Sequence, residues 1–286
     1  MKKKLAYTGY IIGVLVLCLY FMFPADDVTA YINYKINAIS PNVKWTLQGL
    51  KPAFPPGVTL ASLEASRGAE KLVRLDKVKL APSLFSLLTK DKTIRVTGDI
   101  CDGDMDATVA FSGITASPKI EVHGTFEDVQ ISQISALKEV KLFQTSGIAA
   151  GTVAFSNKED PAGKGNAQIK IAESGIQFTP ALFGVGQVTF KSVDADMALA
   201  GQTITLKRLD IDGREASGKA TGSLTLMRPV EKSRVNITGE VTPHPGMIKQ
   251  LGTQFPVELM EGMKTKTGGI PFRLSGTLEQ PNFMLK

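Results

Sequence analysis

Residue types used in catalysis occur in this chain of 286 residues, but their spacing completes no catalytic set. Ser135 and Lys138 stand three residues apart and Lys266-Thr267-Gly268 follows, as in enzymes whose serine nucleophile is activated by a lysine. The Ser-Asp-Asn segment that such enzymes place between the two is missing. A helix face and a turn account for both segments, so we predict no catalytic residue and no enzymatic activity.

Candidate metal and cofactor sites are incomplete in the same way. Asp102, Asp104 and Asp106 alternate as in a calcium loop, but the glycine and the closing glutamate of an EF-hand are absent. Alternate acids on the wet face of a strand explain them as well. Gly184-Val185-Gly186 lacks the third glycine of a dinucleotide-binding turn. With two histidines, two cysteines and no Cys-x-x-Cys pair, we predict no metal and no cofactor.

The two histidines have no sequence neighbours that mark a general base. His123 falls on the polar phase of a strand and is expected to be exposed. His244 lies between two prolines, which is typical of a turn.

Composition and charge exclude further classes. Hydrophobic residues make up 43% of the chain, enough for a folded core, so disorder along the whole length is excluded. Three lysines at positions 2–4 account for half of the net charge of +6, and the remaining charges of both signs are interspersed. Such a surface lacks the basic stripe of a nucleic-acid-binding protein, and we predict no nucleic-acid partner.

Residues 5–23 form an uncharged apolar run that follows these lysines and precedes Asp26 and Asp27. As a helix it rises about 28 Å, close to the roughly 30 Å of a hydrocarbon core. We predict a cytoplasmic stub at 1–4, a transmembrane anchor at 5–23 and a periplasmic body at 24–286. The alternative is a signal peptide cleaved at Val28-Thr29-Ala30, although the run is longer than a typical signal core. The side chains chosen for the anchor are Leu5, Ile11, Val14, Leu15, Val16, Leu17, Leu19 and Phe23.

The body alternates apolar and polar residues almost throughout, which predicts strands with one dry and one wet face. This pattern favours antiparallel pairing, because strands of parallel sheets are buried on both faces. We therefore predict a mainly β fold: one long curved antiparallel sheet, with short helices at 82–90, 131–140, 244–251 and 257–263. The alternating runs are 94–96, 107–111, 120–122, 153–155, 167–171, 176–178, 188–190, 193–199, 204–206, 216–224, 235–237 and 272–274.

A five-residue pattern of apolar, any, Gly, any, apolar recurs six times, centred on Gly98, Gly124, Gly151, Gly222, Gly239 and Gly276. Period-two geometry places each glycine on the dry face of its strand. One interpretation is a strongly curved sheet whose concave face needs small residues and leaves an apolar groove. The other is ordinary glycine at bulges and bends.

Three segments carry a resemblance to a known family: VRLDKVKLAPSLFSLL at 73–88, LKRLDIDGREASGKATGSLTL at 206–226 and GGIPFRLSGTLEQPNFML at 268–285. With the N-terminal anchor, the chain resembles the type II secretion system protein N family, which is related to AsmA-like envelope proteins. The resemblance implies a single-pass protein of the bacterial inner membrane with a periplasmic β domain. Its implied partners are the inner membrane and other secretion-system subunits. AsmA-like proteins also imply an alternative function, in which an apolar groove binds or transfers lipid.

Overall fold

A computed structural model describes the structure of residues 7, 10–11, 14, 18, 20–39, 43–53, 57–68, 70–83, 86, 89, 91–112, 119–134, 143–182, 185–229, 232–246 and 268–285. It contains a helix α2 (Ala25–Ile39), a short 3₁₀ helix η2 (Ile131–Gln133) and fifteen strands. The strands are β1 (Lys44–Gln48), β2 (Lys51–Ala53), β3 (Gly57–Arg67), β4 (Glu70–Pro82), β5 (Asp91–Ile100), β6 (Gly103–Ser112), β7 (Lys119–Gln130), β8 (Phe143–Ser156), β9 (Lys164–Leu182), β10 (Val185–Ala200), β11 (Thr203–Gly213), β12 (Ala216–Thr225), β13 (Arg234–Pro243), β14 (Ile270–Thr277) and β15 (Pro281–Leu285).

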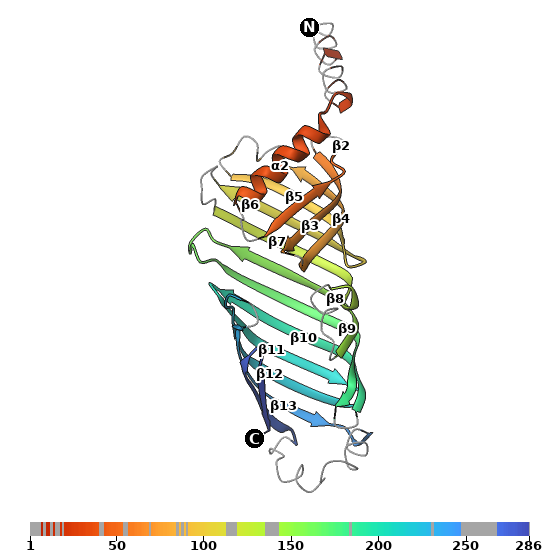
Figure 1. The fold of residues 1–286 in the computed structure, drawn as a ribbon, viewed down its shortest axis with the longest axis vertical. Coiled ribbons are helices and arrows are strands. Elements are labelled where there is room, and N and C mark those ends of the chain that lie inside the picture. Colours follow the sequence, from red (N-terminus) through yellow and green to blue (C-terminus); the bar gives the residue numbers. More distant parts are fainter. Residues whose placement is uncertain are drawn as a thin grey trace.

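All fifteen strands belong to one antiparallel sheet. From β3 to β15 each strand pairs with its neighbours in sequence, while β1 and β2 both pair with β3. The ribbon shows the strands stacked one after another along the long axis of the molecule (Figure 1). The predicted mainly β fold with a long antiparallel sheet is therefore confirmed.

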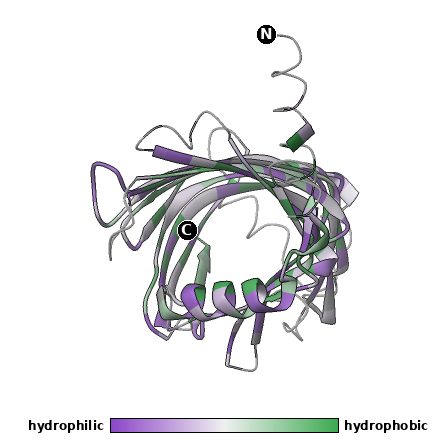
Figure 2. Ribbon diagram, turned by 90° about the horizontal axis from the view of Figure 1, so that it is seen from above, coloured by the Kyte–Doolittle hydropathy of each residue, from purple (hydrophilic) through white to green (hydrophobic). Residues whose placement is uncertain are grey.

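The sheet is strongly curved. Seen from above, the strands curl around a common centre, and α2 lies across one side of the curl with its hydrophobic side toward that centre (Figure 2). Bulges contribute to this shape, since an extra residue bends its strand and increases its twist. Lys77, Asp128 and Glu173 have positive φ angles of 50°, 56° and 48°, and each lies beside a shift in the strand register.

The main core lies between α2 and the first strands. On α2, Val28, Ile32 and Ile36 recur at helical spacing and pack against buried side chains of the sheet. The cluster that they cover comprises Leu47, Leu50, Leu60, Leu75 and Val78. The sequence analysis missed this helix, and the proposed cleavage site at 28–30 lies inside it.

Two asparagines of α2 bind the edge of the sheet as a neighbouring strand would. Asn37 Oδ1 accepts a hydrogen bond from the Trp45 amide at 2.8 Å, and its Nδ2 donates to the Trp45 carbonyl at 2.8 Å. One turn earlier, Asn33 makes the same pair of bonds with Leu47, at 2.9 and 3.4 Å. The backbone groups of an edge strand that would otherwise stay unpaired are thus satisfied by a helix.

The predicted short helices are mostly corrected or lie outside the described residues. Pro82 does not begin a helix but ends β4, and among the other described residues of 82–90 only Ser86 lies in a 3₁₀ turn. The helix expected at 131–140 is a 3₁₀ turn over Ile131–Gln133 in its described part. Of the segment 244–251, only residues 244–246 are described: His244 lies outside the helix, and Pro245 and Gly246 are helical. All of 257–263 lies beyond the described residues.

Candidate functional site

One face of the sheet carries an unbroken row of apolar residues and glycines. The register of each strand pair places thirteen residues side by side, one on each strand from β3 to β15. At about 4.8 Å between strands, the row is about 58 Å long. Its members are Val58, Leu80, Val96, Ala107, Gly124, Val153, Ala167, Met197, Leu206, Gly222, Ile237, Leu274 and Phe283.

Two further rows flank the first and contain no charged or hydrogen-bonding side chain. We call the three rows together the apolar face. On one side stand Pro82, Ile94, Val109, Val122, Phe155, Gly165, Leu199, Ile204, Leu224, Val235, Gly276 and Pro281. On the other stand Gly98, Met105, Phe126, Gly151, Ile169, Ala195, Leu209, Ala220, Gly239, Phe272 and Leu285.

The apolar face is the concave face, because α2 packs on the same side of the sheet. Leu80 of the central row and Val96 beside it belong to the cluster beneath α2. Beyond the helix the face is accessible: Val153 is 40% exposed, and Met197, Leu206 and Ile237 are only half-buried. Among the described residues of β10–β15, no cluster of buried hydrophobic residues covers this face.

The six recurring glycines all stand in the three rows, so their predicted position on the dry face is confirmed. Only Gly276 has a positive φ, of 103°, so the other five are not glycines of left-handed turns. Two of the six face an aromatic ring across the strand pair. A Cβ on Gly151 would lie 2.9 Å from the Phe126 ring, and one on Gly239 would lie 2.9 Å from the Phe272 ring. The missing side chains therefore make room for these rings on the apolar face.

The opposite face is polar, and its charges are largely paired. Arg95 binds Asp106 across β5 and β6, and Arg208 binds Asp196 at 2.8 Å and Asp210 at 3.0 Å. A shallow depression of about 750 Å³ on this face is lined by Arg95, Asp106, Thr108, His123, Thr125 and Thr152, among others. Because its arginine and aspartate neutralise each other, the depression offers no free charge for a substrate.

The two histidines that the sequence analysis considered as possible bases lie on different strands of the sheet or at their ends. His123 is exposed, as expected, and lies 3.2 Å from Glu121 Oε1. His244 follows the end of β13: its Nε2 lies 3.1 Å from Ser217 Oγ and its Nδ1 lies 3.0 Å from the Arg214 carbonyl oxygen. The third partner is a backbone carbonyl and not a carboxylate, so no Ser-His-Asp set is completed.

The alternating aspartates do not converge. Asp102 lies in the turn before β6, while Asp104 and Asp106 project from the polar face and Asp106 is held by Arg95. No group of metal-ligating side chains occurs in the described part of the chain. Ser135, Lys138 and 266–267 lie outside the described residues.

Most of the predicted anchor also lies outside the described residues, including Leu5, Leu15, Val16, Leu17 and Leu19. Ile11 and Val14 are helical and exposed, at 62% and 42%. Phe23, the last residue of the predicted anchor, packs against the core cluster beneath α2. Within the described residues, no helix has the length and apolar character needed to cross a bilayer.

Sequence reasoning missed the row itself, although it found most of its strands. Alternation identifies the dry face of one strand but not its register with the next. One sign of the register is visible in the sequence: the spacing of apolar residues changes from two to three at bulges, as between Phe126 and Val129 or between Leu206 and Leu209.

No family model matches the chain, and no curated protein or solved structure matches it at a significant level. The resemblance to the type II secretion system protein N family therefore stays a prediction.

Proposed function

We propose that the apolar face binds the acyl chains of lipids, and that the protein is a non-enzymatic lipid-binding or lipid-transfer component of the bacterial envelope. The observation that supports this most directly is the row from Val58 to Phe283, which crosses thirteen strands without a polar side chain.

The size of the face is the first argument. Beyond the strands beneath α2, the three rows lie about 6.8 Å apart, run about 43 Å from β6 to β15 and cover about 590 Å² of sheet. The largest exposed apolar patch of an ordinary soluble protein covers about 300–600 Å² and often marks a binding site. The length also exceeds the roughly 30 Å thickness of a hydrocarbon core, so the face accommodates several acyl chains end to end.

The chemistry of the face favours lipid over a protein partner. Protein interfaces carry about one hydrogen bond per 100–200 Å², so a protein that covered this area would use about three to six polar groups. The three rows supply no polar side chain. Acyl chains need no hydrogen bonds and gain about 0.8 kcal/mol for each methylene group removed from water.

Adjacent residues of β8 provide a matched test, because Val153 projects from the apolar face and Thr152 from the polar face. We expect Val153→Asp to lose labelled phospholipid that the wild-type protein binds, whereas Thr152→Asp retains it. Native mass spectrometry of the detergent-extracted full chain measures endogenous lipid in the same variants. A lipid-free wild-type protein that also takes up no labelled phospholipid would contradict the proposal.

We place this protein in the bacterial inner membrane, with residues 5–23 as an uncleaved anchor and the body in the periplasm. The uncharged run and the preceding lysines support this orientation. The position of residues 28–30 inside α2 supports retention of the anchor, because cleavage there would divide a helix whose Val28 packs on the core. Intact-mass measurement of the membrane fraction tests it: loss of about the first 30 residues would overturn it.

A second candidate function is a structural role in the type II secretion system. It is favoured by the three resembling segments, which correspond to most of β4 with the residues that follow it, the β11–β12 hairpin and the β14–β15 hairpin. Gene deletion followed by analysis of the secreted proteins tests this role, and normal export of every substrate would count against it. Secretion by the Val153→Asp variant then separates the two functions, since a purely structural role does not require bound lipid.

A further inference from the structure

We infer that the outer face of α2 lies on the membrane surface, with the rings of Tyr31 and Tyr34 in the headgroup region of the bilayer. The inference rests on the proposed membrane location. It adds an interaction surface to that location and fixes which end of the apolar face lies next to the bilayer.

α2 carries few charges beyond its first turn. Its inner face packs Val28, Ile32 and Ile36 on the core. Its outer face exposes Tyr31 at 62% and Tyr34 at 71%. Ala30 and Ala38 are exposed on the same side, Asp26 and Asp27 are exposed in the first turn, and Lys35 is the one charged residue of α2 beyond that turn. An ordinary surface helix carries its charged residues on this side.

The nature of the exposed residues points to an interface between apolar and aqueous phases. Tyrosine combines an apolar ring with a polar hydroxyl, and it is enriched at the level of lipid headgroups. Lys35 lies with its Nζ 5.6 Å from the centre of the Tyr31 ring. A lysine beside an interfacial ring extends its ammonium group toward lipid phosphates while its methylene stem stays in the apolar layer.

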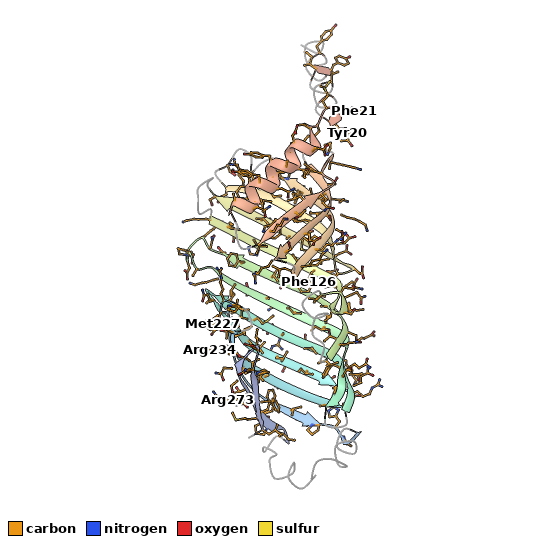
Figure 3. All side chains as sticks on the ribbon, viewed as in Figure 1. Tyr20, Phe21, Phe126, Met227, Arg234 and Arg273 are labelled. Atoms are coloured by element: carbon orange, nitrogen blue, oxygen red, sulfur yellow. The ribbon has the colours of Figure 1, made fainter. Side chains whose placement is uncertain are left out.

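Chain connectivity brings the same helix to the membrane. Only Pro24 separates Phe23, the last residue of the apolar run, from the first residue of α2. Immediately before this junction, Tyr20, Phe21 and Met22 are 49%, 76% and 80% exposed. Tyr20 and Phe21 project from the chain where it enters α2 (Figure 3). The exposed aromatic side chains thus continue from the predicted anchor onto α2.

A bilayer fits these observations better than a second protein. The exposed stripe is one helix wide and adjoins a segment predicted to enter the membrane. A consequence is that the sheet end formed by β1–β5, which α2 covers, lies against the bilayer, while β15 lies farthest from it.

Fluorescence quenching tests the position of the outer face in the full chain. The protein has one tryptophan, Trp45, so Trp45→Phe gives a background without tryptophan. Tyr34→Trp in this background places a reporter on the outer face of α2, and Thr221→Trp places a control on the exposed polar face of β12. Both variants are reconstituted in phosphatidylcholine nanodiscs whose acyl chains carry bromine near the headgroup or near the bilayer centre.

We expect bromine near the headgroup to quench the Tyr34→Trp reporter at least twofold more than bromine near the centre, and to leave the Thr221→Trp control unquenched. A reporter that emits like exposed tryptophan and is unquenched would overturn the inference. A blue-shifted but unquenched reporter would overturn it too, because a protein and not lipid would then cover the face. Both results leave the proposed location intact if the protein still incorporates into nanodiscs, whereas failure to incorporate would refute the location itself.

Discussion

Asn37 holds α2 against the edge of β1, and its replacement by alanine tests whether a helix takes the place of a strand there. The change removes two hydrogen bonds of 2.8 Å to the backbone of Trp45. At about 1 kcal/mol net for each, the loss is about 2 kcal/mol. Alanine favours the helix over asparagine by about 0.6 kcal/mol, so we expect a net destabilisation of about 1.5 kcal/mol.

Two measurements check this expectation. Denaturant unfolding followed by Trp45 fluorescence reports the free energy near β1, and hydrogen exchange of residues 44–48 reports the freed amide. Asn37→Asp is the matched variant, because it keeps the acceptor for the Trp45 amide and should preserve that amide's protection. Tyr34→Ala on the exposed side of the same helix should change stability by less than about 0.5 kcal/mol. If Asn37→Ala has an equally small effect and leaves exchange at β1 unchanged, the proposed edge interaction is wrong.

Three further outcomes are expected. Gly239→Ala places a Cβ 2.9 Å from Ala220 Cβ and should cost about 1–3 kcal/mol of unfolding free energy, whereas Gly186→Ala, with no atom within 4 Å, should not destabilise. Hydrogen bonds from Lys158 and then His123 hold the pKa of Glu121 below its usual value. The stabilisation that these bonds give is present above about pH 4.5 and is lost as the pH falls through the lowered pKa. On acidification, the melting temperature of the Glu121→Gln variant should therefore fall less than that of the wild-type protein. Leu15→Arg should cost about 3 kcal/mol of membrane insertion, measured as a shift from the membrane fraction to the soluble fraction; an unchanged distribution would argue against the anchor.

The sequence predicts the strands of this fold better than their lengths. Alternation identifies 167–171 and 176–178 as two separate runs, yet both belong to β9. The bulge at Glu173, where φ is 48°, shifts the apolar phase from odd to even positions without ending the strand. A period-two pattern detects such a shift only as a break, because the pattern contains no information on the partner strand.

The missed helix has a different cause. Val28, Ile32 and Ile36 show helical spacing, but they follow the predicted anchor directly and overlap the candidate cleavage site. The partners that give these residues a core, such as Leu60 and Val78, come from strands more than twenty residues later. The row on the concave face was unpredictable for the same reason, since each of its members is fixed by pairing across strands and not by its own neighbours.

The strand order described above also bears on how this protein folds and evolves. From β4 onward each strand pairs only with strands adjacent in sequence, so each new strand of the growing chain finds its preceding partner already in place. Such a chain grows by addition at one end, and its stability is close to a sum of nearest-neighbour terms, as in repeat proteins. Inserting or deleting one hairpin leaves the remaining pairs and their facing residues unchanged. The fold therefore does not fix the length of the sheet, and adding or removing two strands changes the length of the apolar face by about 10 Å.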